Sequence, residues 1–341
     1  MPLSKTTPEN IARPPAFNPL ESLAARLGPD LAAVNGIILD RMKSDIPLIP
    51  ELAGHLIAAG GKRIRPVLTL ASAAMFGYTG DRQYKLAACV EFIHTATLLH
   101  DDVVDASDLR RGRASANALF GNEAAVLVGD FLFSRSFQLM VEDGSLDVLR
   151  ILSNASAVIA EGEVLQLSTA NNLETTEDQY YQVIGAKTAE LFAAACEVGA
   201  VVAGRTSGEC ATMRAYGQAL GMAFQISDDI LDYTASEARL GKSLGDDFRE
   251  GKMTLPVLLA LQGAPQSERD FWKRCMTDLD QKEGDLKEAR RLLQIHNSIG
   301  KSLDIARNYA AEGRNLLADL PRNDFSADLE ALITFAVERD Y

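Results

Sequence analysis

Cysteine is scarce in this 341-residue chain, and the four cysteines lie far apart without a CxxC pair. That spacing excludes a disulfide framework and a zinc ribbon, and it favours reduced core thiols in a cytoplasmic protein. Long hydrophobic runs are missing too, because the longest uncharged stretch that we find, residues 67–80, has only 14 residues. A helix needs about 20 apolar residues to cross a bilayer, so we expect no membrane span. The cysteines are Cys89, Cys196, Cys210 and Cys275.

Positive charge is in deficit, with 34 Lys and Arg residues against 47 Asp and Glu residues and a formal net charge of -13. An acidic chain repels a phosphate backbone, so we expect no nucleic-acid partner and favour divalent cations instead. Residues 1–19 are rich in proline and lack the apolar segment of a signal peptide, which predicts a loose N-terminal arm. Residues 20–341 contain no composition shift and no long linker, which predicts one domain.

Strand signals are also absent, since β-branched runs are short and no stretch alternates polar and apolar residues beside a hairpin turn. Apolar residues recur at three- and four-residue spacing, as at Leu86, Val90 and Ile93, which is the period of a helix. Interruptions at glycine, proline and asparagine, Gly185 among them, predict about a dozen helices. The predicted fold class is therefore all-α, a single-domain helical bundle.

The pattern Asp-Asp-x-x-Asp occurs twice, 127 residues apart, and each copy follows an apolar helical stretch. Residues four apart lie on one face of a helix, so the outer carboxylates of each copy would address one ligand. Their repulsion favours a cation between them, and carboxylate oxygens suit Mg²⁺ that bridges to a diphosphate. A single copy is typical of a solvated helix face, whereas two equivalent copies favour a metal site. The residues are Asp101, Asp102, Asp105, Asp228, Asp229 and Asp232.

Basic residues gather in three places despite the deficit. Two clusters flank the first acidic copy, and a third lies in a glycine-rich segment after the second copy, where it would form a cover. Arginine binds phosphate oxygens in pairs and lysine adds a mobile charge, so the clusters favour anionic substrates over the alternative of solvated loops. They comprise Lys62, Arg63 and Arg65, then Arg110, Arg111 and Arg113, and finally Lys242 and Lys252.

Signatures of other chemistries are missing. Residues 60–63 lack Walker spacing, no GxGxxG follows a predicted strand, no GxSxG occurs, and the histidines lack zinc-ligand spacing. His94 lies two helical turns before Asp101 and therefore on the same face. Taken alone, Lys187, Thr188 and Gln225 are ordinary polar residues at the edge of a core.

Five ordered motifs carry a family resemblance: GGKRIRP, EFIHTATLLHDDVVDASDLRRG, GEVLQL, KTAELF and FQISDDILDYTASEARLGKSLGDDFREGKMTLP. From about residue 20 onward the chain resembles the trans-isoprenyl diphosphate synthases, and among them the long-chain all-trans polyprenyl diphosphate synthases such as octaprenyl diphosphate synthase. The resemblance implies the isoprenoid synthase fold, a helical bundle around a central cavity, as a homodimer. It also implies an Mg²⁺-dependent enzyme that adds isopentenyl diphosphate repeatedly to an allylic diphosphate, with farnesyl diphosphate as primer, to make a quinone side chain.

The same resemblance implies the role of each motif residue. Metal binding would fall to Asp101, Asp105, Asp228, Asp229 and Asp232, and catalysis to Asp101, Asp102, Asp105, Arg110, Lys187, Asp228 and Lys242. Isopentenyl diphosphate would be seated by Lys62, Arg63, Arg65, His94 and Arg111. The allylic diphosphate would be held by Arg110, Lys187, Thr188, Gln225 and Lys242, with Lys252 as a further substrate-binding residue.

Product length depends on the helix that precedes the first acidic copy. Ala96 and Thr97 are small, at positions where short-chain farnesyl synthases of this family carry bulky aromatic residues. Continuing back to Tyr84, the helix adds about 18 Å of apolar wall, past Phe92. We therefore expect a product of about eight to ten isoprene units, C40 to C50.

Three alternatives stay open at this point. A geranylgeranyl or farnesyl diphosphate synthase would differ in product length alone, and a terpene cyclase would not need a cluster for a second diphosphate. A non-catalytic partner subunit of a heteromeric synthase would have no reason to keep repulsive carboxylate pairs. Transient membrane contact, for release of an apolar product, is a further hypothesis.

Overall fold

The structure, a computed structural model, describes residues 18–338 except 59–60, 111–112 and 235–243. The first elements are α1 (Pro19–Arg26), α2 (Gly28–Arg41), α3 (Leu48–Ala58), α4 (Ile64–Met75), α5 (Arg82–Val104), β1 (Leu109–Arg110), β2 (Arg113–Ala114), α6 (Ala116–Phe120), α7 (Asn122–Asp143) and α8 (Leu146–Thr169). They are followed by α9 (Glu177–Ile184), η1 (Gly185–Ala189), α10 (Glu190–Val202), α11 (Ser207–Thr234), α13 (Asp246–Glu250), α14 (Leu255–Leu261) and α15 (Gln266–Trp272). The chain ends with η2 (Lys273–Thr277), α16 (Asp285–Ile295), α17 (Ser298–Leu316), η3 (Leu317–Asp319) and α18 (Asp324–Glu338).

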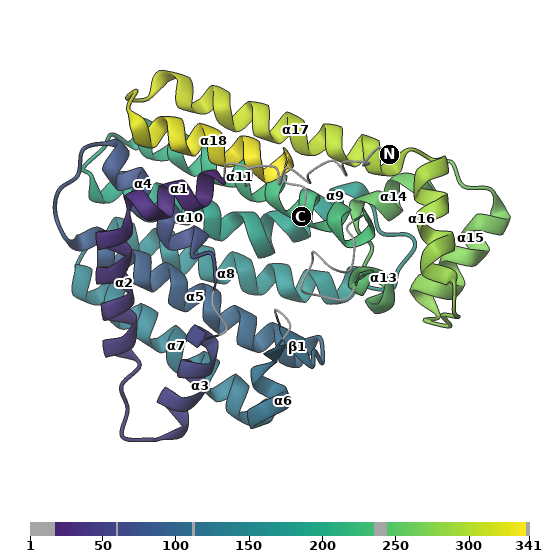
Figure 1. The fold of residues 1–341 in the computed structure, drawn as a ribbon, viewed down its shortest axis with the longest axis horizontal. Helices are drawn as coiled ribbons and strands as arrows, with labels where there is room; N and C mark the ends of the chain where they lie inside the picture. Colours follow the sequence, from purple (N-terminus) through teal and green to yellow (C-terminus); the bar gives the residue numbers. More distant parts are fainter. Residues whose placement is uncertain (1–17, 59–60, 111–112, 235–243, 339–341) are drawn as a thin grey trace, which may run out of the picture.

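The prediction of an all-α fold is confirmed, and the long helices lie in layers (Figure 1). α17 and α18 pack on each other and on α11, α11 packs on α10, and α10 contacts α4, α5 and α8. On the other side, α5 packs along α7. The expectation of no hairpin needs a small correction, because β1 and β2 form an antiparallel pair of two residues each directly after α5.

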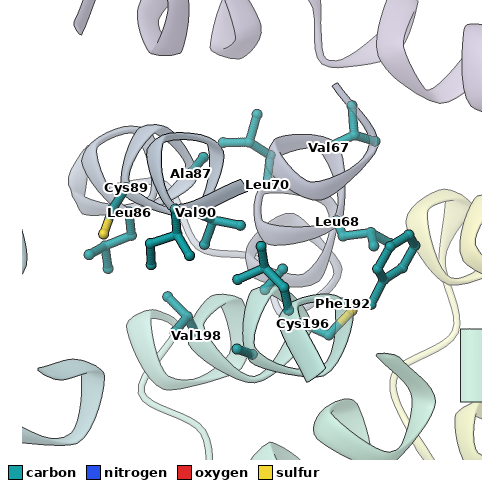
Figure 2. Close-up of a cluster of buried hydrophobic side chains, with 14 of the residues drawn as sticks. Val67, Leu68, Leu70, Leu86, Ala87, Cys89, Val90, Phe192, Cys196 and Val198 are labelled. Carbon is teal, nitrogen blue, oxygen red and sulfur yellow. The ribbon is translucent and has the colours of Figure 1, made fainter. Parts of the chain in front are cut away.

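The core between α4, α5 and α10 is shown in Figure 2. Aliphatic side chains from the three helices meet there, and Leu68 of α4 lies next to Phe192 of α10. α4 and α10 approach closely because Gly199 has no side chain: a Cβ atom there would lie 2.6 Å from both Ser72 Cβ and Thr69 O. The cysteine prediction is confirmed, since all four thiols are free and buried.

The predicted helix break at Gly185 is wrong. The chain passes from α9 through the wider turn η1 into α10 without leaving helical geometry, and Gly185 has φ -61° and ψ -49°. Glycine ends a helix where the backbone turns left-handed, whereas in a helical conformation it only weakens the helix. Here the packing of η1 against α8 and α11 keeps the segment helical.

The expectation that no segment is long and apolar enough to span a bilayer also needs correction. By length and composition alone, α7 is long and apolar enough to span a bilayer. An 18-residue stretch of this helix has a mean hydropathy of 1.4, and 39% of that stretch is buried inside the protein. A core helix of a bundle has the same composition, and α7 packs along α5 with one face. Its other face bears exposed apolar side chains, including Leu127 and Val141.

Candidate active site

The C-terminal ends of α5 and α11 bring the two acidic motifs to one site. Lys252, which follows α13, links them: its Nζ atom lies 3.8 Å from Asp105 Oδ2 of the first motif. Burial lowers the pKa of Lys252, but Asp247 and Asp105 raise it, and the net direction is upward. Burial raises the pKa of Asp247, and the nearby carboxylate of Asp229 raises it further. The predicted pair of motifs therefore faces a shared set of charges.

In the first motif, the outer and middle aspartates have different partners. Burial raises the pKa of Asp101, Lys187 opposes this shift, and Asp105 adds to it. Asp102 points inward, is 1% exposed, and accepts hydrogen bonds at 2.8 Å from Arg110 Nε on both of its oxygens. Arg110 thus forms an ion pair with the first motif, and its predicted contact with the allylic diphosphate stays a prediction.

The middle residue of the second motif, Asp229, is also buried but has neutral partners. Tyr180 Oη donates to its Oδ2 at 2.6 Å, and Gln225 Nε2 donates to its Oδ1 at 2.8 Å. Burial raises the pKa of Asp229 to about 7, although both hydrogen bonds lower it. Thr188 Oγ1 donates to Gln225 Oε1 at 2.9 Å, so two of the predicted allylic-site residues belong to one hydrogen-bond chain.

The two outer residues of the second motif, Asp228 and Asp232, have different surroundings. Asp232 accepts backbone hydrogen bonds from Asp246 at 3.2 Å and Asp247 at 3.1 Å. Burial raises the pKa of Asp232 to about 6, against the effect of those hydrogen bonds. Asp228 is exposed. Asp232 is therefore oriented by α13, and Asp228 is the member of this motif with the most exposed side chain.

Lys187 lies in η1, opposite α8. Its Nζ donates to Glu163 Oε2 at 2.7 Å and lies 3.6 Å from Asp101 Oδ2. Burial, followed by the Asp101 charge, raises the pKa of Glu163 to about 7, and Lys187 opposes this. Lys187 thus lies beside the first motif, and its predicted contact with the allylic diphosphate stays a prediction.

The second predicted substrate subsite lies at the start of α4. Arg65 Nη1 lies 3.0 Å from His94 Nε2, and the Arg65 guanidinium is 4.7 Å from the centroid of the Phe192 ring. Arg63 is held by Glu91 of α5 in an ion pair. Lys62 is exposed. The structure brings Arg65 and His94 together, whereas Arg63 is turned to Glu91.

Of the two proposed chain-length residues, Ala96 is buried inside the bundle and Thr97 is half-buried. Ala96 is 1% and Phe92 2% exposed, and the Cys89 thiol donates to Ser136 O of α7 at 3.4 Å. Thr97 Oγ1 donates to the backbone oxygen of His94 at 2.9 Å, so the hydroxyl is bound to its own helix and the methyl group is the remaining part of the side chain. This face of α5 is therefore apolar and directed towards α7.

Two predicted site residues, Arg111 and Lys242, lie outside the described residues. Conversely, the structure adds Glu163, Tyr180 and Asp247, to which no role was predicted. Glu163 lies in the GEVLQL motif and Asp247 in the glycine-rich segment, so the sequence held a signal for both. For Tyr180 the sequence offers no signal, because its partner is 49 positions away.

Among the residues that the structure describes, no three His, Cys, Asp or Glu side chains are grouped closely enough to hold a metal ion by themselves. Mg²⁺ does not need such a cage, since it keeps several waters and binds through one or two carboxylates together with substrate phosphates. The carboxylates at the ends of α5 and α11 fit that mode of binding, because they are hard donors and a cation would offset the burial, and the repulsion from neighbouring carboxylates, that raise the pKa values of Asp101 and Asp232.

Comparison with known proteins gives consistent results. Residues 46–293 match the polyprenyl synthetase family model. The chain is 46% identical over 327 residues to octaprenyl diphosphate synthase of Escherichia coli, an alignment that covers 94% of this chain and 99% of that protein. A crystal structure of a decaprenyl diphosphate synthase from Rhodobacter capsulatus is 52% identical with a TM-score of 0.91, covering 94% and 99% of the two chains.

A second solved structure adds bound ligands. It is a polyprenyl synthase from Caulobacter crescentus, complexed with calcium and isoprenyl diphosphate, and it is 51% identical with a TM-score of 0.91. The match covers 94% of this chain and 98% of that one.

Proposed function

The chain belongs to the polyprenyl synthetase family, and we propose that it joins isopentenyl diphosphate repeatedly to an allylic diphosphate, making an all-trans polyprenyl diphosphate of about eight to ten isoprene units. The observation that carries this proposal is the meeting of two acidic motifs with Lys187 and Lys252 at the ends of α5 and α11. The names of the octaprenyl and decaprenyl relatives support the long product. Residues 20–341 would form one catalytic domain.

We propose Mg²⁺ as the cofactor. Asp101 and Asp105 of the first motif and Asp228 and Asp232 of the second would hold it. Asp229, which we also predicted as a ligand, has both oxygens engaged by Tyr180 and Gln225 and would support the motif from behind. When bound, Mg²⁺ would supply positive charge to the allylic diphosphate as its bond to carbon breaks.

The chain's own residues would stabilise the departing diphosphate and the allylic cation in different ways. Lys187 and Lys252 place ammonium groups beside the first motif, where negative charge builds up as the carbon–oxygen bond breaks. Arg110, held by Asp102, adds a fixed positive charge at the same end of α5. The apolar face of α5 would exclude water from the cation. The released diphosphate is the proposed acceptor of the proton lost when the new carbon–carbon bond forms.

The second substrate would bind at the start of α4. Arg65 and His94 form one polar pair there, and Lys62, three positions before Arg65 in the sequence, is exposed. Together with Arg63, and with Arg111 outside the described residues, they would seat the diphosphate of isopentenyl diphosphate. The diphosphate of this substrate is not cleaved, so these residues would bind it equally in the ground state and the transition state.

We propose a homodimer formed through α7 and α8. Exposed apolar side chains gather on these helices: Val126, Leu127, Phe137, Val141, Leu146, Val164 and Leu167. Exposed apolar side chains that are concentrated on neighbouring helices are typical of a protein interface. Sedimentation of the full chain tests it: a dimer is expected, and a monomer at micromolar concentration would contradict it.

We also propose that the enzyme is cytoplasmic and contacts a membrane transiently to release its apolar product. Liposome co-sedimentation with and without product tests that contact.

Product analysis is the test of the reaction. The protein would be incubated with Mg²⁺, isopentenyl diphosphate and farnesyl diphosphate, and the dephosphorylated prenyl alcohols sized by mass spectrometry. A series that ends near eight to ten units is expected. Products of three or four units would keep the chemistry and replace the long-chain assignment by a shorter-chain synthase. No Mg²⁺-dependent product would overturn the proposal in favour of a non-catalytic partner subunit.

A further inference from the structure

Glu163 on α8 lies in the site, although none of the predicted roles includes it. Its Oε2 atom accepts a hydrogen bond from Lys187 Nζ at 2.7 Å, and its side chain is 27% exposed. The other oxygen, Oε1, is buried and accepts no hydrogen bond from the described residues. Lys187 Nζ is farther from the first acidic motif, at 3.6 Å from Asp101 Oδ2. The ammonium is thus held by Glu163, and Asp101 is its second neighbour.

The backbone beside Glu163 also controls where Lys187 lies. Lys187 belongs to η1, a π-helical turn, and such turns are often found at functional sites. Gly162 faces this turn from α8: a Cβ atom there would lie 2.6 Å from Ala186 Cβ and 3.1 Å from Lys187 N. The two segments therefore approach closely because residue 162 has no side chain. Gly162 sets the distance of η1 from α8, and Glu163 sets the direction of the Lys187 side chain.

We propose that Glu163 is a positioning residue, which holds the Lys187 ammonium at the place where it meets the leaving diphosphate and keeps it off Asp101. The inference rests on the proposed function, because it assumes that Lys187 contacts the allylic diphosphate. Lysine is a mobile charge on a flexible stem, so its position depends on a partner. Without Glu163, the nearest carboxylate within reach is Asp101, and an ion pair there would occupy a carboxylate that we assign to the metal.

A positioning role predicts a specific kinetic result. Without the Glu163 charge the Lys187 ammonium shifts towards Asp101 but stays beside the site of the allylic diphosphate, so binding of this substrate should weaken little. Stabilisation of the leaving group should weaken, because the ammonium no longer lies at the right place. We therefore expect Glu163→Gln to lower kcat about tenfold, the lower end of the effect of a supporting partner, while KM for farnesyl diphosphate stays within about twofold.

Glu161→Gln is the matched control, since Glu161 lies two positions away on the same helix with an exposed side chain. It should leave kcat, KM and the melting temperature unchanged. An unchanged kcat in Glu163→Gln would overturn the inference. A raised KM with normal kcat would also overturn it, because Glu163 would then contribute to binding instead of positioning. A large loss of melting temperature in Glu163→Gln would indicate a structural role alone.

Gly162→Ala tests the same geometry with the carboxylate intact. The added methyl group must displace η1, and kcat should fall while the KM for isopentenyl diphosphate is unchanged. Gly36→Ala is its control, because a Cβ atom at this helical glycine of α2 meets nothing within 4 Å. A normal kcat in a folded Gly162→Ala enzyme would contradict the proposed spacing. If Gly162→Ala does not fold, the double-mutant cycle below decides.

The cycle combines Glu163→Gln with Lys187→Ala. If Glu163 acts through Lys187, the double variant should be no slower than Lys187→Ala alone. In Lys187→Ala the Glu163 carboxylate has lost its partner, so replacing Glu163 by Gln should restore part of the activity of that variant. Additive losses would overturn the inference and leave the proposed function standing. Normal kcat and KM in Lys187→Ala would instead overturn the assigned role of Lys187, so the two failures are distinguishable.

Discussion

The two acidic motifs have the same sequence pattern, yet their middle aspartates are held by different chemistry. Asp102 is buried against a guanidinium, with Arg110 Nε at 2.8 Å from both carboxylate oxygens. Asp229 is buried against two neutral donors, Tyr180 and Gln225, and burial raises its pKa to about 7. Both middle residues point into the protein, and their partners come from different parts of the fold.

The difference shows that a repeated motif does not imply a repeated role for every position. In each copy the outer aspartates lie at the site, where Asp105 and Asp232 have cationic or backbone neighbours. The middle aspartates instead anchor the end of their helix. Asp102 forms an ion pair with a charged partner, whereas Asp229 has neutral partners, and burial, which penalises the charged form, raises the pKa of Asp229 to about 7.

The largest effect should come from removing an outer aspartate. Asp101→Ala takes away a carboxylate proposed to hold the metal and the second neighbour of Lys187, and we expect kcat/KM to fall by about a thousandfold. The melting temperature should change little, because relief of repulsion offsets the lost contact. Asp304→Ala, at an exposed position on α17, is the control. Near-normal turnover in Asp101→Ala would remove the metal assignment of the first motif.

The helices that lead into the two motifs differ as well. Phe224, four residues before Asp228, packs on Phe192 with ring centroids 5.6 Å apart, whereas the corresponding position in the first copy is Thr97. Before the second motif, α11 thus carries an aromatic ring at the position where α5, before the first motif, carries a small side chain. We infer that the growing chain passes along α5 and not along α11.

Ala96→Phe would place a bulky ring on α5, next to Thr97, the position that corresponds to Phe224. The ring would lie about 7.5 Å along the helix from Asp101, so products should shorten to roughly three or four isoprene units. Ala88→Phe, about 12 Å farther along α5, should give intermediate lengths. Mass spectrometry of the prenyl alcohols measures both. An unchanged product length in Ala96→Phe would show that the chain grows elsewhere.

Isosteric substitution of the two middle aspartates tests the contrast directly. Asp102→Asn removes the charge of a buried carboxylate, 1% exposed, and leaves the Arg110 guanidinium without its ion-pair partner, so we expect a loss of about 3 kcal/mol in the free energy of unfolding. Asp229→Asn keeps an acceptor for Tyr180 and removes a charge that is costly to bury, so we expect a loss below about 1 kcal/mol. Urea unfolding in metal-free buffer measures both. Equal losses would mean that the two motifs are held alike.

Much of this could be predicted from the sequence, because helical period and motif position are local properties. The apolar spacing of α5 and α11 predicted both helices, and the acidic motifs at their ends identified the site. The break at Gly185 was predicted wrongly because glycine is compatible with a helix when tertiary packing keeps its backbone helical.

The residues that orient the site could not be predicted in the same way. Tyr180 and Glu163 act on partners 49 and 24 positions away, and which face of α9 or α8 meets those partners depends on tertiary packing. The inward turn of Asp102 was also hidden, since the sequence gives equal weight to all three aspartates of a motif. Local pattern thus locates a site, whereas long-range contacts decide what each of its residues does.

The smallest expected effect concerns a second Arg–Asp ion pair, in which the carboxylate is more exposed than that of Asp102. Arg274 Nη1 and Nη2 lie 2.8 and 2.9 Å from the two oxygens of Asp285, whose side chain is 13% exposed against 1% for Asp102. The Arg274 hydrogen bond lowers the pKa of Asp285 to about 2. Since solvent screens this pair, Asp285→Asn should lower the free energy of unfolding by only about 1 kcal/mol at pH 7.

The pH dependence of that difference has a definite sign. The folded-state pKa of Asp285 is lowered from its ordinary value of 3.8, so the stabilisation is complete above that value and is lost as the pH falls towards about 2. The difference between wild type and Asp285→Asn in urea unfolding should therefore shrink between pH 5 and about pH 3. Asp304→Asn, with an exposed partner in Arg307 at 3.3 Å, should show almost no difference at either pH. A loss in Asp285→Asn that equals that of Asp102→Asn would show that burial does not set the strength of these pairs, and the contrast between the two motifs would then need another cause.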